Sequence, residues 1–176
     1  MNDSKPKMLR SPEKIGYKEF SDMVDDLPNG MIKAMICVAY ASGARVSELN
    51  RILSSDIWVE GDYLIIRCRV LKKRSNKPEF RLVPVRLDES WLTTPIINYK
   101  NAIPSDSRLF DYHRATIYKK VWAAININPH GFRKLRLTHL ATRYKFTDQQ
   151  LTKFAGWADS TPAKAYVKLN LDDIKY

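Results

Sequence analysis

The sequence predicts a mainly α-helical domain with one small antiparallel β-sheet. Apolar residues recur at three- and four-residue spacing over most of the chain, as they do on the buried face of a helix. Residues 63–70 and 80–85 differ, because they are rich in the β-branched and aromatic side chains that favour strands. With 176 residues, the chain has the size of one ordinary domain with its own core.

The helices are expected from their caps and from apolar spacing. Ser11 and Pro12 are typical of an N-cap followed by proline in the first helical position, and Pro28-Asn29-Gly30 ends that first helix. Residues 31–40 are apolar on nearly all sides, which predicts a helix buried in the core, with Gly43 as its left-handed terminator. Further helices are expected over 45–53, 91–100, 115–126, 132–144, 148–155 and 162–170.

A strongly basic connection joins the two predicted strands. Within residues 71–78 it carries four cations: Lys72, Lys73, Arg74 and Lys77. This arrangement is typical of an antiparallel hairpin with a positively charged tip. Pro84 lacks the N–H that a strand interior requires, so it indicates a strand end or an edge strand.

The charge of the chain indicates an anionic partner. Thirty Lys and Arg residues against nineteen Asp and Glu give a formal charge of +11, which attracts nucleic acid or an anionic membrane surface. No membrane-spanning helix is expected, because the longest apolar run, 31–41, is far shorter than the roughly 20 residues required. No apolar signal core follows the N-terminus, so we expect a cytoplasmic location in the cell or host cell. Cys37 and Cys68 lack disulfide or zinc spacing and are expected to be core or surface thiols.

Two arginines are candidates for holding a phosphate. Cleavage of a phosphodiester without metal requires cations around the non-bridging oxygens, a nucleophile and a proton donor. Arg45 and Arg133 suit the first task, because a guanidinium pairs with phosphate through two hydrogen bonds and keeps its charge. Glu48 follows Arg45 by three residues and can hold that guanidinium in place, or it can form an ordinary surface salt bridge.

His130 and Tyr166 are candidates for proton transfer and nucleophilic attack. His130 precedes Arg133 by one helical turn and can exchange a proton near pH 7. Tyr166 lies downstream of Gly156-Trp157, and neighbouring cations must stabilise its phenolate because a phenol normally titrates near pH 10. The three histidines lack metal-ligand spacing and no acidic cluster joins them, so neither a metal nor another cofactor is expected.

These segments together resemble the catalytic domain of tyrosine recombinases, the phage-integrase family. The resemblance covers about residues 11–171, with motifs in the family's order: A-R-V-S-E-L, the basic hairpin before R-L-V-P-V, H-G-F-R-K-L-R-L-T-H-L-A-T, F-A-G-W and A-Y-V-K-L. The forms F-R-x-x-R-x-T-H-L-A and G-W are similar to archaeal and archaeal-virus integrases. The resemblance implies the catalytic-domain fold over residues 11–176, after a flexible lead or linker over residues 1–10.

The resemblance also implies a role for each motif residue. Tyr166 attacks the scissile phosphate, forming a 3′-phosphotyrosyl link and freeing a 5′-hydroxyl, while Arg45 and Arg133 hold the non-bridging oxygens. His130 handles the proton of the nucleophile. Trp157 occupies a position where many relatives have histidine, and its indole N–H can donate to a phosphate oxygen but cannot carry a proton.

A hairpin lysine is implied as the proton donor to the leaving oxygen. The register after Val70 favours Lys73, with Lys72 and Lys77 as alternatives. Arg136 competes with Arg133 for the role of the second phosphate-holding arginine. If Arg136 took that role, Arg133 would match the family's histidine position and His130 would have no role. We therefore assign a DNA-backbone role, or a place on a solvated charged face, to Lys72, Arg74, Lys77 and Arg136.

The implied function is site-specific integration or excision at an attachment site in double-stranded DNA. Relatives usually carry an N-terminal DNA-clamping domain for which this chain has no room, so we expect a fragment or a short enzyme with salt-sensitive, weak DNA binding. A monomer is expected in the free state and a tetramer on synapsed DNA. The alternatives are a non-cleaving DNA-binding relative, a type IB topoisomerase-like strand transferase, and a general nucleic-acid-binding module.

Overall fold

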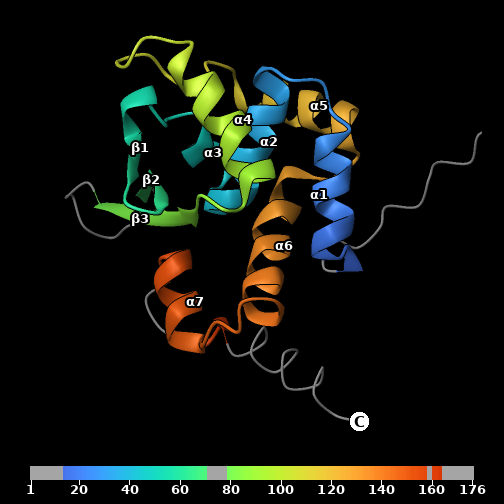
Figure 1. Ribbon diagram of the computed structural model, residues 1–176, viewed down its shortest axis with the longest axis vertical. Helices are drawn as coiled ribbons and strands as arrows, with labels where there is room; N and C mark the ends of the chain where they lie inside the picture. The colour runs from blue at the N-terminus through green and yellow to red at the C-terminus, as the bar shows by residue number, and fades with distance from the viewer. Residues whose placement is uncertain (1–13, 71–78, 158–159, 164–176) are drawn as a thin grey trace, which may run out of the picture.

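The computed structural model describes residues 14–70, 79–157 and 160–163. The sheet occupies one side of the molecule beside α3, and the longer helices occupy the other, with α6 running down to α7 (Figure 1). The α-helices are α1 (Tyr17–Asp25), α2 (Met31–Ser42), α3 (Val46–Leu49), α4 (Ser90–Asn101), α5 (Arg114–Ile125), α6 (Pro129–Thr142) and α7 (Asp148–Ala155). A 3-10 turn, η2 (Ser54–Asp56), precedes the strands β1 (Ile57–Glu60), β2 (Tyr63–Val70) and β3 (Glu79–Arg86).

The three strands form an antiparallel sheet in the order β1-β2-β3. β2 and β3 pair along their whole length, so that Val70 lies opposite Glu79 where the hairpin connection begins and ends. Pro84 lies on β3, an edge strand, where its missing N–H is tolerated. The mainly α fold with one small antiparallel sheet is therefore confirmed, while β1 is a strand that sequence analysis did not predict.

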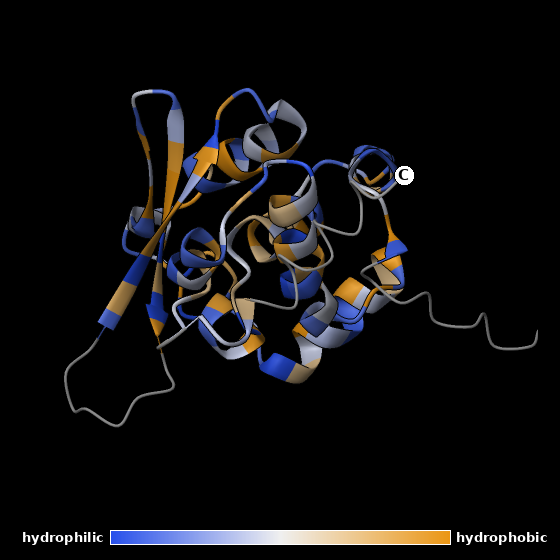
Figure 2. Cartoon of the chain, turned by 90° about the horizontal axis from the view of Figure 1, so that it is seen from below, coloured by the Kyte–Doolittle hydropathy of each residue, from blue (hydrophilic) through white to orange (hydrophobic). Residues whose placement is uncertain are grey.

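Alternation along the strands buries one face of the sheet. Leu64, Ile66 and Cys68 of β2 are buried, and so are Val83 and Val85 of the neighbouring β3. Figure 2 shows the sheet from another direction as a layer beside the helices, with apolar and polar residues alternating along its strands. The sheet therefore closes one side of the hydrophobic core.

Helix α2 is the centre of that core. Every residue from Lys33 to Ser42 is buried, and α2 packs against α1, α4, α5 and α6. Burial raises the pKa of Cys37 in α2 to about 12 and that of Cys68 to about 11, so both are inert core thiols at neutral pH. In the described ranges, no helix is long and apolar enough to cross a bilayer.

Helix boundaries agree with the sequence prediction most closely where a cap is explicit. Gly43 is left-handed, with φ of 60°, and its amide donates to Ala39 O, so α2 ends as predicted. Thr147 and Gln150 form the predicted capping box of α7. The helix predicted over 45–53 is shorter, Val46–Leu49, and α6 begins three residues early because Asn128 Oδ1 accepts the amide of His130. The helix predicted over 162–170 lies almost wholly outside the described residues.

A buried ion pair fastens α6 to the rest of the fold. Both Nη atoms of Arg136 donate to the carboxylate of Glu89, at 3.1 and 3.2 Å, and both side chains are buried. The hydroxyls of Tyr17 and Tyr144 donate to the same carboxylate, each at 2.8 Å. Burial alone raises the pKa of Glu89, but Arg136 and these hydrogen bonds outweigh burial and hold that pKa below its ordinary value.

A buried histidine extends this network to α2. His139 Nε2 lies 2.8 Å from the carbonyl oxygen of Ile15, so it carries the proton and donates, which leaves Nδ1 to accept from the hydroxyl of Tyr40 at 2.7 Å. Burial lowers the pKa of His139, and nearby Arg136 lowers it further against the opposing effect of the Ile15 carbonyl. The imidazole is therefore neutral in the folded protein.

Replacing Glu89 by alanine should cost about 3–5 kcal/mol of unfolding free energy, because the guanidinium of Arg136 then stays buried without its carboxylate. Asp88→Ala is the matched control, since the ion pair of Asp88 with Arg86 is exposed and should contribute little. Urea unfolding measures both. Equal losses in the two variants would show that the buried pair has no special weight.

Acidification should destabilise the protein through His139. The unfolded chain takes up a proton near the ordinary pKa of 6.5, whereas the folded chain resists protonation, so stability should decline as the pH falls below 6.5. Urea midpoints at about pH 7.5 and about pH 5.5 measure the decline. His139→Gln should reduce the difference between the two pH values, and His113→Gln, at an exposed position, should retain it. An unchanged difference in His139→Gln would exclude His139 as its origin.

Candidate functional site

A cavity of about 450 Å³ opens where the start of α3, the β2–β3 hairpin, α6 and the end of α7 meet. Three residues that sequence analysis assigned to phosphate chemistry line it together: Arg45, Arg133 and Trp157. The remaining lining residues are Glu48, Val70, Glu79, Phe80, Arg81, Ala155 and Gly156. The fold therefore collects three arginines and an indole N–H from segments that are distant in sequence, which is a donor set suited to an oxyanion.

Arg133 is held by two main-chain carbonyls. Its Nη1 donates to Gly43 O at 3.0 Å and its Nη2 donates to Ala155 O at 2.7 Å. The guanidinium carbon also lies 5.7 Å from the ring centroid of Trp157, within cation–π range. Arg133 therefore ties the turn after α2 to the end of α7, and its position at the cavity is defined by the backbone.

Arg45 is the N-cap residue of α3, directly after the turn that Arg133 contacts. Glu48 is buried, and its Oε2 accepts a hydrogen bond from the backbone N–H of Arg45 at 3.0 Å. In the described part of the chain no ion pair joins Glu48 to the Arg45 guanidinium. The expected side-chain pairing is therefore corrected: Glu48 positions Arg45 through its main chain.

Arg81 is a cavity residue that sequence analysis missed. It is 8% exposed, and its Nη1 donates to Phe154 O at 2.8 Å. Its Nη2 is buried without a hydrogen-bond partner among the described residues, 4.0 Å from Glu48 Oε2. The strand register is what could have identified it. Arg81, the first residue of the strand motif R-L-V-P-V, pairs with buried Cys68, so its side chain faces the interior side of the sheet.

The end of α7 places Trp157 at the cavity. Gly156 terminates the helix in the left-handed region, with φ of 70°, and the amide of Trp157 returns to Thr152 O. A Cβ on Gly156 would lie 3.2 Å from Cδ of Arg81, so the turn packs closely on that arginine. Arg81 and Arg133 together bind the carbonyls of Phe154 and Ala155, where cations complement the helix dipole.

His130 does not line the cavity. It lies exposed on the first turn of α6, where its Nε2 shares a hydrogen bond with the hydroxyl of Tyr118. The two rings also meet edge to face, with centroids 5.5 Å apart. The structure thus places His130 one turn before Arg133, with its imidazole directed at a neighbouring phenol.

Arg136 is not available to DNA, because it is 2% exposed and paired with Glu89. Its predicted backbone contact is therefore corrected to a role in the fold, and Arg133, not Arg136, is the arginine of α6 that lines the cavity. Tyr166 and the hairpin cations lie outside the described residues, and these cations are Lys72, Lys73, Arg74 and Lys77. In the described ranges, no cluster of His, Cys, Asp and Glu is arranged to hold a metal ion.

The sequence model of the phage integrase family matches residues 17–172. The chain therefore belongs to the phage integrase family, whose members are tyrosine recombinases. No curated protein sequence matches it.

Solved recombinase structures share the fold. XerH site-specific recombinase bound to its difH substrate matches with a TM-score of 0.62 at 20% identity, over 89% of this chain and 49% of that one. XerA recombinase matches with a TM-score of 0.63 at 15% identity, over 97% and 66%. A lambda integrase dimer bound to a COC′ core site matches with a TM-score of 0.59 at 14% identity, over 98% and 51%. The chain thus spans about half to two thirds of their lengths.

Replacing Gly43 by alanine should disturb the site. A Cβ there would lie 3.3 Å from Cε1 of Phe154 and 3.6 Å from Cγ of Arg133, in addition to the cost of the left-handed backbone, about 1–2 kcal/mol. Gly61→Ala is the matched control, because Gly61 has a similar φ of 57° and open space around it. Urea unfolding should show the larger loss in Gly43→Ala. Equal losses would mean that crowding at Arg133 adds nothing.

Proposed function

We propose that the protein cleaves and rejoins DNA strands at a specific site through a covalent 3′-phosphotyrosyl intermediate on Tyr166. One observation carries the proposal: Arg45, Arg133 and Trp157 line a single cavity. Their donors suit the non-bridging oxygens of a phosphodiester and the charge that develops on them in the transition state. The phosphotyrosyl link conserves the energy of the broken bond, so rejoining needs no external energy source.

The remaining groups are assigned by their position along the chain. Val70 and Glu79, where the described hairpin ends, both line the cavity, which supports Lys73 as the donor to the 5′-oxygen, with Lys72 and Lys77 as alternatives. Tyr166 follows Trp157 by nine residues. His130 takes the proton of Tyr166 in this scheme, which requires its imidazole to exchange the hydrogen bond with Tyr118 for one with Tyr166. Protonation of the 5′-oxygen then completes cleavage, and the reverse steps rejoin the strands.

The substrate in this proposal is an attachment site in double-stranded DNA. The structures of XerH and of lambda integrase contain their DNA, and the net charge of +11 fits the same partner. The motif forms F-R-x-x-R-x-T-H-L-A and G-W support an archaeal or archaeal-virus integrase. We further propose a monomer in the free state, a tetramer on synapsed DNA, and action in the cytoplasm of the cell or host cell.

Covalent trapping tests the proposal. Incubation with a pool of nicked duplexes carrying randomised cores should yield a denaturant-resistant protein–DNA adduct, because loss of the short leaving fragment prevents rejoining. Tyr166→Phe should bind DNA as before and form no adduct. Tyr63→Phe, at an exposed position on β2, should form the adduct at the normal rate.

The other outcomes identify the alternatives. DNA binding without any adduct would identify a non-cleaving relative. Relaxation of supercoiled plasmids that carry no selected site would favour a type IB topoisomerase-like enzyme. An adduct that persists in Tyr166→Phe would assign the nucleophile to another residue.

A further inference from the structure

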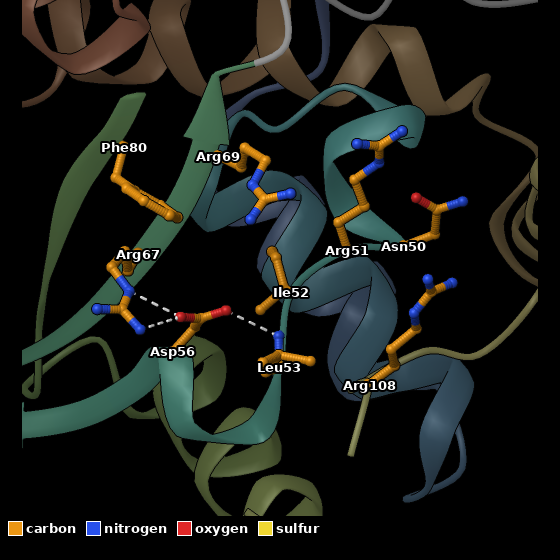
Figure 3. Close-up of a pocket in the computed structure, with 9 residues that line it drawn as sticks. All are labelled: Asn50, Arg51, Ile52, Leu53, Asp56, Arg67, Arg69, Phe80 and Arg108. Atoms are coloured by element: carbon orange, nitrogen blue, oxygen red, sulfur yellow. Dashed lines mark hydrogen bonds and ion pairs between the residues drawn. The ribbon is translucent and has the colours of Figure 1, made fainter. Parts of the chain in front are cut away.

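A second cavity, of about 500 Å³, lies beside the first and is lined by four arginines (Figure 3). Arg51 comes from the turn after α3, Arg67 and Arg69 from β2, and Arg108 from the segment before α5. Figure 3 shows Arg67 and Arg69 on the strand side of the opening, Arg51 and Arg108 across from them, and Arg67 turned toward Asp56. The family motifs do not include any of these four arginines.

The charge in this cavity is strongly unbalanced. Asp56 is the only carboxylate among the residues that line it, and it is already engaged. It accepts from Nε of Arg67 at 2.7 Å, lies 2.6 Å from Nη2 of the same guanidinium, and accepts the amide of Leu53 at 2.9 Å. One acid therefore neutralises one of the four arginines.

The other three arginines lack comparable partners. Within the described ranges, neither Arg51 nor Arg69 forms an ion pair. Arg108 has only an exposed contact with Asp111, at 3.9 Å, which solvent screens. Three exposed guanidiniums that line one opening suit an anion with several oxygens, such as a phosphate.

Phe80 connects this cavity to the first one, which Arg45 and Arg133 line. It lines both, and its side chain is 48% exposed although it is large and apolar. The guanidinium carbons of Arg67 and Arg69 lie 5.3 and 5.6 Å from its ring centroid, so cation–π contacts hold the ring in place. An exposed aromatic face beside phosphate-binding cations is suited to a DNA strand, whose deoxyribose can pack on the ring.

We propose that this arginine cavity binds the DNA backbone next to the phosphate held by Arg45 and Arg133. The inference rests on the proposed function and extends it: the strand contacts the domain in two adjacent recesses separated by Phe80. A DNA strand fits this arrangement better than an isolated anion, because its successive phosphodiesters can occupy both recesses at once. The second contact increases affinity and fixes the register of the strand, and it takes no part in the chemistry.

The test uses the full chain with Arg51→Gln, Arg69→Gln and Arg108→Gln, singly and combined. All three positions are exposed, so the variants should fold. Anisotropy of a labelled duplex over a salt series should show each single variant binding about five- to tenfold more weakly near 0.1 M salt. The slope of log K against log salt should fall by about one for each arginine removed. Arg86→Gln, at the opposite end of β3, removes the same charge and should bind like the unaltered protein.

A kinetic arm separates binding from chemistry. At saturating duplex, the combined variant should lose much less of the single-turnover rate of Tyr166 adduct formation than of duplex affinity, because the cavity holds the flanking strand and not the reacting phosphate. A normal duplex affinity and salt slope in the combined variant, while the unaltered protein still forms the adduct, would overturn this inference and leave the proposed function intact. If the unaltered protein binds DNA and forms no adduct, the proposed function fails, while the affinity series still tests the cavity.

Two controls distinguish other occupants. Calorimetry with inorganic phosphate should show no saturable binding below millimolar concentrations. Tight phosphate binding that the variants abolish, with DNA affinity unchanged, would mean that the cavity takes a free anion instead. Sedimentation without DNA should give the same mass for all variants. Self-association that the combined variant abolishes, again with unchanged DNA affinity, would assign the cavity to a second copy of the chain.

Discussion

The guanidinium of Arg133 forms the contacts on which the geometry of the cavity between α3, α6 and α7 depends. It binds the carbonyl of Gly43, two residues before Arg45, and the carbonyl of Ala155, two residues before Trp157. These three side chains approach one another only if the turn after α2 and the end of α7 lie at fixed positions on α6. The glycine at position 43 is part of this requirement, since its left-handed backbone presents the carbonyl and a side chain there would press on Phe154.

Helix α6 serves the site and the fold with two arginines one turn apart. Arg133 reaches the cavity, whereas Arg136 is buried against Glu89 and joins the helix to α1 and α4 through Tyr17 and the residues around it. Such a buried pair is expensive to desolvate and is tolerated only when its hydrogen bonds are nearly complete, as they are here on the carboxylate. The rigidity of this network keeps α6 in place, and with it the arginine that organises the cavity.

Local patterns were sufficient to predict most of the fold. Apolar spacing and caps identified α2 and α7 with almost correct ends, and β-branched residues identified β2. Four residues of β1 were too short a signal, because β1 exists only through its pairing with β2. α3 proved shorter than predicted, since no cap residue marks its end.

The site was predictable only in part, because side-chain direction depends on partners far along the chain. The sequence offered Arg45 and Arg133 as phosphate-holding arginines, and the resemblance added Trp157, but it could not show that Arg136 meets Glu89, 47 residues earlier, and is withdrawn from solvent. It likewise put His130 and Arg133 on one helix without revealing that the imidazole turns to Tyr118. The arginine cavity was invisible in sequence, because its residues come from three segments with no common motif.

The buried Nη2 of Arg81 has a consequence for redesign of the domain. Among the described residues this donor has only a 4.0 Å contact with Glu48 and no hydrogen bond, and a buried donor left without a hydrogen bond costs about 1–3 kcal/mol. The same donor lines the cavity and is available to an acceptor there, so stability and ligand binding make opposite demands on position 81. Redesign of this domain for stability alone would therefore favour an apolar residue at position 81, and the more stable protein would lose one of the three guanidiniums at the cavity.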